Sequence, residues 1–212
     1  MGGPSARMEV IRGDITTLHV DAIVNAANTS LLGGGGVDGT IHKAAGPELL
    51  AETRTLGGCP TGEARMTRGY RLPAKHVIHA VGPVYRGGHA GEADLLRSAY
   101  TSSLRLAEEA GLDAVAFSCI STGVYGYPKP AACDIAIDTV AAWLAGHDRP
   151  FRVVFCCFDA ENERLYRERL HALENAWEVS CDRLRAQARE RGITEDDVLS
   201  AVHEERYGGD PE

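Results

Sequence analysis

A chain of 212 residues is long enough to bury one sizeable core, and 44% apolar and 25% charged residues are ordinary values for a globular protein. No apolar run approaches the roughly 20 residues that a membrane-spanning helix needs, so we expect no membrane segment. Residues 173–212 hold 11 Asp and Glu against 5 Lys and Arg, and thus −6 of the net charge of −8. The near-neutral remainder has no basic stripe, which disfavours polymeric nucleic acid and is compatible with an anionic small ligand.

Cysteine and histidine usage gives no sign of a metal centre. The six cysteines include no Cys-x-x-Cys pair, and several lie in apolar runs, where cysteine behaves as a small hydrophobic residue. This usage is typical of a reducing cytoplasm, where we place the protein. The eight histidines include no His-x-x-x-His pair, and His79 is interpreted as a strand residue. The sequence therefore predicts neither a metal site nor a resident cofactor.

Strand-like and helix-like segments follow one another along the chain. The expected strands are residues 8–12, 22–25, 63–67, 76–81, 114–117 and 152–157. The expected helices are residues 38–45, 48–56, 94–110, 130–145 and 161–171. This alternation predicts an α/β fold on a largely parallel sheet, in which ligands bind beyond the carboxyl ends of the strands.

The most unusual segment runs from Asn25 to His42, where four consecutive glycines, Gly33 to Gly36, separate a strand from a helix. Glycine loses more backbone entropy on ordering than any other residue, so such a run indicates that something approaches the backbone closely. A strand, a glycine loop and a helix N-terminus together present free N–H groups to an anion, usually phosphate. Asp38 and His42 follow at i, i+4 spacing and share one helix face. The alternative is a flexible linker in which Asp38 only caps a helix.

A second loop, Ser118 to Pro128, has hydroxyls, glycines and two tyrosines between a strand and a helix. Hydroxyls and backbone N–H groups of residues 121–123 could hold a second phosphate, and Tyr125 could stack on a sugar or base. The alternative is a plain turn with packing tyrosines. Phe158 follows the last strand, so three segments are expected to converge at the carboxyl edge of the sheet.

These segments resemble the macrodomain family, and within it the MacroD-like ADP-ribosyl hydrolases of bacteria and mitochondria. The resemblance covers roughly residues 8–171, with the motifs in the family's order and spacing. They are Gly13-Asp-Ile-Thr16, Val24-Asn-Ala-Ala-Asn28, Gly33-Gly-Gly-Gly-Val-Asp-Gly39, Ala44-Ala-Gly-Pro47, Leu72-Pro-Ala-Lys75, Val81-Gly-Pro83 and Ile120-Ser-Thr-Gly-Val-Tyr-Gly-Tyr-Pro128. Ser118 departs from the pattern, since relatives often carry proline there, and this affects backbone rigidity more than chemistry.

The resemblance implies a three-layer α/β/α sandwich on a mixed, largely parallel sheet over residues 1–172. It also implies ADP-ribose as the ligand, in a cleft across the strand ends with its diphosphate between the two loops. Asp14 would accept a hydrogen bond from the adenine amino group, with the Ile15 backbone nearby, and Phe158 would pack against the adenine. The diphosphate and distal ribose would contact Gly35, Gly36 and Val37 on one side and Ser121, Thr122, Gly123, Val124 and Tyr125 on the other.

For catalysis, the resemblance implies that Asp38 orients or deprotonates a water that attacks the anomeric carbon of an ester-linked ribose. Asn28 would fix the hydroxyls of that ribose, and His42 would support the site. A bound diphosphate would raise the pKa of Asp38 by like-charge repulsion and make it a better base. Whether Asp38 or the substrate phosphate takes the proton stays open.

The expected activity is removal of mono-ADP-ribose from acidic side chains of ADP-ribosylated proteins, deacylation of O-acetyl-ADP-ribose, or both, since both are ester cleavages at the same sugar. The alternative is a non-catalytic ADP-ribose reader that recruits partners through its tail. Processing of a phosphorylated ADP-ribose metabolite is a third reading. Asp38 discriminates between the first two, because a reader can dispense with this carboxylate.

The tail, residues 173–212, is expected to be an acidic helical extension. Apolar residues recur at three- and four-residue steps over residues 170–188, so the last core helix should continue, or restart, to about Arg191. Thr194 and Asp197 fit the N-cap and N3 positions of a second short helix to about Tyr207. The apolar seam of this hairpin must be buried against the macrodomain, in a homodimer or on a partner protein, and the sequence does not decide between them.

Overall fold

The computed structural model describes residues 3–147, 149, 151–194 and 197, which belong to two compact units, Met1–His171 and Ala172–Glu212. The strands are β1 (Met8–Arg12), β2 (Ala22–Ala26), β3 (Ala64–Arg68), β4 (His76–Ala80), β5 (Ala114–Phe117) and β6 (Arg152–Cys157). The α-helices are α1 (Gly36–Ala45), α2 (Pro47–Thr55), α3 (Glu92–Glu109), α4 (Lys129–Ala145) and α5 (Ala160–Glu190). Two short 3₁₀ helices are η1 (Pro4–Arg7) and η2 (Ile15–Thr17).

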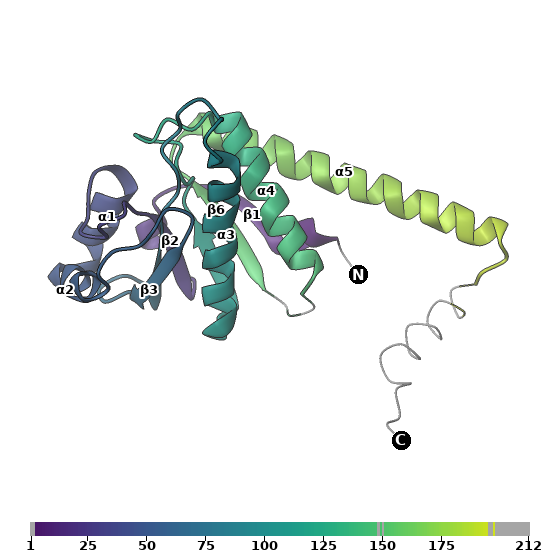
Figure 1. Ribbon diagram of the computed structural model, residues 1–212. Helices are drawn as coiled ribbons and strands as arrows, with labels where there is room; N and C mark the ends of the chain where they lie inside the picture. The colour runs from purple at the N-terminus through teal and green to yellow at the C-terminus, as the bar shows by residue number, and fades with distance from the viewer. Residues whose placement is uncertain (1–2, 148, 150, 195–196, 198–212) are drawn as a thin grey trace, which may run out of the picture. The chain divides into compact units, whose positions relative to one another are not determined.

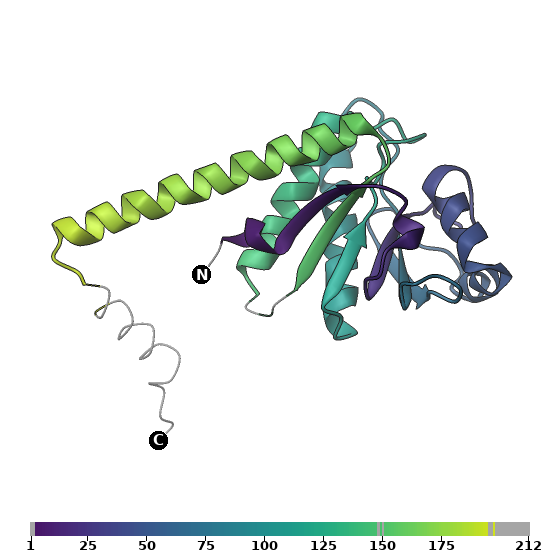
Figure 2. The ribbon, with the colours of Figure 1, turned by 180° about the vertical axis from the view of Figure 1, so that it is seen from behind.

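The first unit is built on a six-stranded sheet with the order β1-β6-β5-β2-β4-β3 (Figures 1 and 2). β3 pairs antiparallel with β4, and all other neighbouring strands are parallel. The prediction of a mixed, largely parallel sheet is therefore confirmed. Because five adjacent strands run in one direction, the segments that follow them meet along one edge of the sheet.

The two faces of the sheet are covered by different helices, as the alternation of strand side chains requires. On one face, Ile23 of β2 and Val77 of β4 are paired in register and pack in a cluster with Ile41 of α1 and Leu49 of α2. α3 and α4 cover the opposite face (Figure 1). These three layers confirm the predicted α/β/α sandwich.

A stack of aromatic rings forms the centre of the second face. Phe117 of β5 is fully buried, with ring centroids 5.0 Å from Tyr100 of α3 and 6.2 Å from Phe155 of β6. Phe155 contacts the fully buried Tyr166 in the first turns of α5 at 5.1 Å. Burial of several large rings in one cluster supplies much of the apolar area that stabilises the unit.

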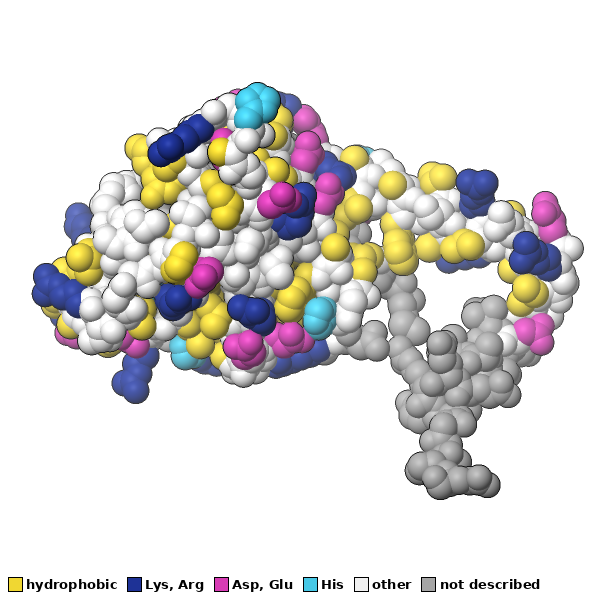
Figure 3. Space-filling view, in the orientation of Figure 1, with side chains coloured by type: hydrophobic (Ala, Val, Ile, Leu, Met, Phe, Trp, Pro, Cys, Tyr) yellow, Lys and Arg dark blue, Asp and Glu magenta, His cyan; other side chains and the backbone are white. Residues whose placement is uncertain are grey.

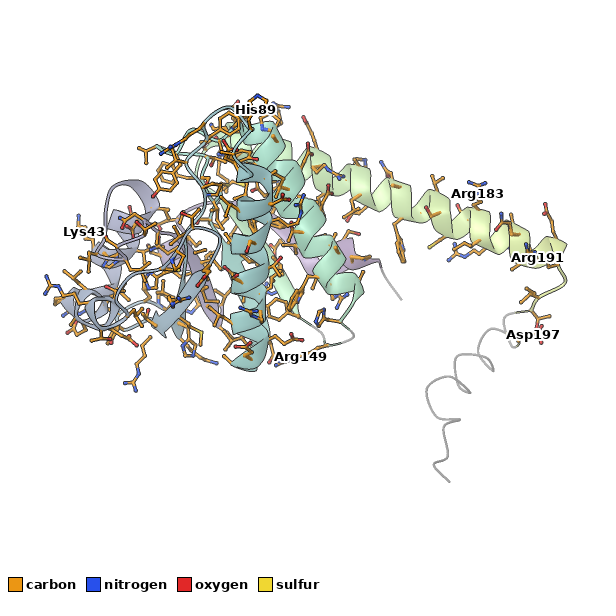
Figure 4. All side chains as sticks on the ribbon, viewed as in Figure 1. Lys43, His89, Arg149, Arg183, Arg191 and Asp197 are labelled. Carbon is orange, nitrogen blue, oxygen red and sulfur yellow. The ribbon has the colours of Figure 1, made fainter. Side chains whose placement is uncertain are left out.

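The amino edge of the sheet is closed by hydrogen bonds. Asp21, before β2, accepts from the backbone N–H groups of Asp113 and Ala114 at 3.0 and 3.1 Å and from Lys75 Nζ at 2.8 Å. The hydrogen bond from Lys75 is the main cause of the lowered pKa of Asp21. At the same edge, Arg149 binds the Gly111 carbonyl and Asp113 (Figure 4). These bonds hold the amino ends of the strands together, whereas the long loops lie at the carboxyl ends.

The outer surface of the first unit carries both signs of charge. On the face shown in Figure 3, Lys and Arg side chains are interspersed with Asp and Glu. No helix in the described part of the chain is both long and apolar enough to cross a membrane.

α5 continues without interruption to Glu190. Of the two predicted possibilities, that the last core helix continues beyond residue 171 or that a new helix restarts there, the structure shows the first. After it, the backbone N–H and Oγ1 of Thr194 both donate to Asp197 Oδ2, at 2.8 and 2.6 Å, and Asp197 N donates back to Thr194 Oγ1 at 3.2 Å. The predicted capping pair is thus confirmed. The helix expected from there to about Tyr207 lies outside the described residues.

Replacement of Phe117 by alanine should destabilise the protein by about 3–5 kcal/mol, because it opens a cavity in the middle of the aromatic stack. Urea denaturation measures the change. Phe117→Leu is the control, since it keeps most of the volume and should cost less than about 1.5 kcal/mol. Equal costs for the two variants would contradict the central packing role of the ring.

Candidate active site

A cleft of about 540 Å³ lies across the carboxyl ends of β1, β6, β5 and β2. The segments that follow these four strands all contribute to its walls. Among its lining residues are all of the predicted ligand-binding residues: Asp14, Ile15, Asn28, Gly35, Gly36, Val37, Asp38, Ser121, Thr122, Gly123, Val124, Tyr125 and Phe158. The volume is that of a pocket for a drug-sized or cofactor-sized ligand.

The glycine loop forms the wall between β2 and α1. α1 begins at Gly36, earlier than predicted, with Gly35 as its N-cap and without a side-chain cap. Its first N–H groups therefore lie at the cleft without a capping side chain, where they favour an anion. A Cβ on Gly34 would lie 3.1 Å from Asp38 Oδ2 and 3.2 Å from Asn28 Nδ2. A side chain at this position would press on both polar groups, which explains one of the glycines.

The opposite wall is the loop after β5. Ser121 in this loop has φ of +66°, a conformation that costs free energy for a residue with a Cβ. Its buried Oγ has no hydrogen-bond partner among the described residues, so it is available to a ligand. Thr122 Oγ1, by contrast, donates to the Cys119 carbonyl at 2.9 Å. The proton of the Thr122 hydroxyl is thus used within the loop, and the donation of both hydroxyls to phosphate stays a prediction.

The far end of the cleft combines a carboxylate with an exposed aromatic ring. Asp14 Oδ1 accepts from Thr16 N and Thr16 Oγ1 at 2.9 and 2.7 Å and thereby caps η2. Phe158 is 87% exposed, although it is a large apolar side chain. An exposed ring on the wall of a cleft is a surface on which a flat, apolar ligand group can pack.

Asn28 stabilises the glycine loop through hydrogen bonds of both the nitrogen and the oxygen of its side-chain amide. Its Nδ2 donates to the Gly33 carbonyl at 2.9 Å, and its Oδ1 accepts from Ser30 N and Ser30 Oγ at 3.0 and 2.6 Å. The amide carries two N–H protons, so the second one is left for a ligand. Asn28 is therefore a structural residue of the loop as well as a wall of the cleft.

Asp38 is the buried carboxylate of the cleft, only 3% exposed in the first turn of α1. Its Oδ1 accepts from Asn25 Nδ2 at 2.7 Å and lies 3.5 Å from His42 Nε2, whereas its Oδ2 has no partner among the described residues. Burial raises the pKa of Asp38, and the Asn25 hydrogen bond and the His42 charge offset part of the rise. Burial thus raises this pKa before any diphosphate is bound.

His42 is the predicted site residue that does not line the cleft. It faces a second, shallower pocket behind the glycine loop, which is also lined by Lys43 and Arg71. Lys43, labelled in Figure 4, is exposed on α1. His42 lies next to the site, with its Nε2 3.5 Å from Asp38 Oδ1 and its ring centroid 6.0 Å from that of His79.

Asn25 and His79 belong to the site but were not predicted as site residues. Both are completely buried and lie opposite each other in the register of β2 and β4. The sequence contains a pattern that could have identified them, because positions 25 and 79 follow the core-facing positions 23 and 77 at the strand period of two. A polar residue at a core-facing strand position indicates a partner nearby.

Among the described residues, no group of three His, Cys, Asp or Glu side chains comes together as metal ligands would. The polar groups of the cleft are backbone N–H groups, hydroxyls, amides and carboxylates. Such a set suits an anionic organic ligand with hydroxyl groups and a reaction in which water is activated by a carboxylate.

Comparisons with known proteins agree with this reading of the fold. The Macro domain family profile matches residues 24–136. The chain is 54% identical over 170 residues to an O-acetyl-ADP-ribose deacetylase of Citrobacter rodentium, a match that covers 78% of this chain and 96% of the relative. It is 56% identical over 166 residues to the ADP-ribose glycohydrolase MACROD1 of Bos taurus, covering 77% of this chain and 51% of that longer protein.

The solved structures lead to the same family. A Trypanosoma brucei macrodomain in complex with ADP-ribose superposes with a TM-score of 0.72 at 48% identity, covering 76% of this chain and 68% of that chain. The cleft and its loops define an α/β protein that binds an anionic ligand at the carboxyl edge of its sheet. This chain belongs to the macrodomain family.

Replacement of Asp38 by asparagine should stabilise the protein at neutral pH. A raised carboxyl pKa means that the folded state holds the proton more tightly than the unfolded chain, so the ionised form destabilises the fold above that pKa. The gain in melting temperature at pH 7 should shrink as the pH falls through the raised pKa and vanish below the ordinary value of 3.8. Scanning calorimetry across this range measures it.

The matched control is Asp94→Asn, a change at an exposed carboxylate paired with Arg97. It should leave the melting temperature nearly unchanged, because exposed ion pairs contribute at most about 1 kcal/mol. If Asp38→Asn melted at a lower temperature than the wild type at pH 7, the cost of burying the charged carboxylate would not be the largest contribution of Asp38 to stability.

Proposed function

We propose that this protein binds ADP-ribose in the cleft and hydrolyses ester bonds to its distal ribose. It would release mono-ADP-ribose from acidic side chains of proteins and deacylate O-acetyl-ADP-ribose. The observation that carries the proposal is the buried Asp38 carboxylate, whose unpartnered Oδ2 lies beside the glycine loop in the wall of the cleft. The names of the bacterial deacetylase and the bovine glycohydrolase support the same chemistry.

The two loops suit the diphosphate. The uncapped N-terminus of α1 and the loop at residues 121–125 lie on opposite walls of the cleft. Backbone N–H groups at a helix N-terminus favour a bound anion without a basic side chain. The buried hydroxyl of Ser121 adds a donor. This arrangement binds charge with the backbone, in keeping with the near-neutral sequence of this unit.

The adenosine end of the ligand would lie between Asp14 and Phe158. The Asp14 carboxylate, held in place by its cap on η2, would accept from the adenine amino group. The exposed ring of Phe158 would pack against the base. The distal ribose would then reach Asn28 and Asp38 at the other end of the cleft.

In the proposed release of ADP-ribose from a modified protein, a water attacks the anomeric carbon, the bond from that carbon to the ester oxygen breaks, and the glutamate or aspartate leaves as a carboxylate. The leaving group needs no proton at neutral pH, so the reaction needs a base and not an acid. Asp38 Oδ2, which has no hydrogen-bond partner among the described residues, would accept the proton of the water. Burial raises the pKa of Asp38 and makes it a stronger base than an exposed aspartate.

We also propose a cellular location for the protein and a division of roles along the chain. We place the protein in the cytoplasm, supported by its six free cysteines. We assign the binding and catalysis to residues 1–172 and treat residues 173–212 as a separate extension that contacts a partner protein or a second copy of the chain. The division of the structure after His171 supports this assignment.

Asp38→Ala should lower the release of ADP-ribose from a glutamate-modified protein by about a hundredfold or more, the usual effect of removing a general base. Affinity for ADP-ribose should change little, since the glycine loop and the loop at residues 121–125 remain. Product release and calorimetric binding are measured on the same preparations, with the exposed Asp94→Ala as control. Full activity of Asp38→Ala would refute the mechanism, and binding without release by the wild type would make the protein a reader.

Gly35→Glu should weaken ADP-ribose binding by about a hundredfold or more, because like charges brought together in a binding site cost several kcal/mol. Gly35 has φ of −95°, and a Cβ there would meet nothing within 4 Å. The fold should therefore accept the side chain. Calorimetry compares Gly35→Glu with Gly35→Ala, which should bind almost normally. Equal affinities would show that the anion does not lie beside this loop.

A further inference from the structure

A continuous chain of hydrogen bonds lies beneath the cleft and links four elements of the fold. Asp38 Oδ1 of α1 accepts from Asn25 Nδ2 of β2 at 2.7 Å, and the same nitrogen is 3.2 Å from His79 Nδ1 of β4. His79 Nε2 is in turn 3.0 Å from Thr67 Oγ1 of β3. Asn25 and His79 are completely buried and Thr67 is 2% exposed, so no solvent competes for these bonds.

The register of the sheet brings these residues together. Asn25 pairs with His79 across the parallel β2–β4 ladder, and Thr67 pairs with Val77, two residues before His79, across the antiparallel β4–β3 ladder. Their side chains therefore share the face that α1 covers. A buried histidine in this place is often only a satisfied core residue. The protons along the chain indicate a more specific role.

The chain of contacts fixes where the protons lie. Nδ2 of Asn25 carries only protons, so both Asp38 Oδ1 and His79 Nδ1 must accept from it. His79 is then neutral with its proton on Nε2, from which it donates to Thr67 Oγ1. The Thr67 hydroxyl can in turn donate a hydrogen bond to the Arg68 or the Val77 carbonyl, at 3.2 and 3.4 Å. Every proton in this scheme has an acceptor.

The charge state of His79 supports the scheme. Burial, and to a lesser extent the charge of nearby His42, lower the pKa of His79 to about 3. His79 therefore stays neutral over the whole range in which an enzyme of this kind would work, so one of its two ring nitrogens is always an acceptor. The titratable side chains that face Asp38 are His42 on its own helix and, through Asn25, His79 on β4.

The other end of the Asn25 amide shows why its orientation needs support. Asn25 Oδ1 is buried without a hydrogen-bond partner among the described residues, so nothing on that side holds the amide in place. If the amide were rotated by half a turn, its oxygen would face the Asp38 carboxylate and the lone pair of His79 Nδ1. All three groups are hydrogen-bond acceptors, so they would repel one another. The two acceptors together enforce the observed orientation, and removal of one weakens it.

We propose that His79 is a positioning residue for the hydrolysis: its neutral imidazole, with the proton on Nε2, holds the Asn25 amide in the orientation in which it donates to Asp38. The proposal rests on the function proposed above. The hydrogen bond from Asn25 favours the ionised carboxylate and holds Oδ1 beneath the cleft. Oδ2, next to Gly34, is left as the oxygen that faces the reaction.

The test compares His79→Leu with His79→Asn. Leucine and asparagine both branch at Cγ and have the same number of side-chain heavy atoms, so the two variants carry side chains of similar shape. Only the asparagine carries an acceptor at the place of Nδ1. His79→Leu should lower kcat for release of ADP-ribose from a glutamate-modified protein by about tenfold or more, the loss expected for a hydrogen bond in a charged network. The acidic limb of its pH profile should move to higher pH, because Asp38 loses support for its ionised form.

His79→Asn should recover most of kcat and return the pH profile toward that of the wild type. Both variants should bind ADP-ribose as the wild type does, since His79 does not line the cleft, and calorimetric binding also shows that they are folded. Equal kcat losses and equal pH profiles in the two variants would overturn the proposal, because they would show that His79 only fills space.

Two spectroscopic measurements decide the proposal without turnover. The ¹³C titration of the Asp38 carboxyl should show a higher pKa in His79→Leu than in the wild type, and a restored pKa in His79→Asn. An unchanged pKa of Asp38 in His79→Leu would overturn the proposal. If the wild type binds ADP-ribose but releases none from a modified protein, that result refutes only the proposed function, and the titration still tests the role of His79. If His79→Leu does not fold, the ¹⁵N spectrum of the wild-type imidazole decides. It should show the Nε2–H tautomer from pH 5 to 8, and an Nδ1–H tautomer or an imidazolium would overturn the proposal.

Discussion

The hydrogen bond from the Asn25 amide to the Asp38 carboxylate, 2.7 Å long, joins β2, one of the two central strands of the sheet, to the first turn of α1. A carboxylate this deeply buried is stable as an ion only with donors around it, because transfer out of water disfavours the charged form. Asp38 has one firm donor, one nearby histidine and one free oxygen. The protein thereby keeps a carboxylate with a raised pKa at the place where the proposed reaction needs a base.

The same strand periodicity that builds the core also builds the site. On the face covered by α1, β2 presents Ile23 and then Asn25, and β4 presents Val77 and then His79. The first pair packs in the apolar cluster, and the second forms the polar network one step nearer the carboxyl edge. Core and site are therefore continuous, and a shift of register by one residue would remove both at once.

The loops on either side of the cleft are stiffened by their own side chains, so that the ligand meets preformed backbone. Asn28 bonds to the Gly33 carbonyl, and Thr122 bonds to the Cys119 carbonyl. Gly82 lies directly beneath Ser121, where a Cβ would come within 2.2 Å of its hydroxyl oxygen. Local bonds of this kind reduce the entropy lost when a ligand binds. They also explain why polar side chains in these loops are not all available to the ligand.

The sequence by itself determined the order of strands and helices and the two loops, because these follow from local periodicity and glycine content, and the resemblance of its motifs to the macrodomain family added the residues that line the cleft. Tertiary structure alone decided that Thr122 bonds within its loop, that His42 lies behind the glycine loop, and that α5 runs unbroken to Glu190. It also decided that Asn25, His79 and Thr67 support Asp38. These contacts join residues that are far apart in the chain, and their proton directions depend on register and burial, which no local pattern encodes.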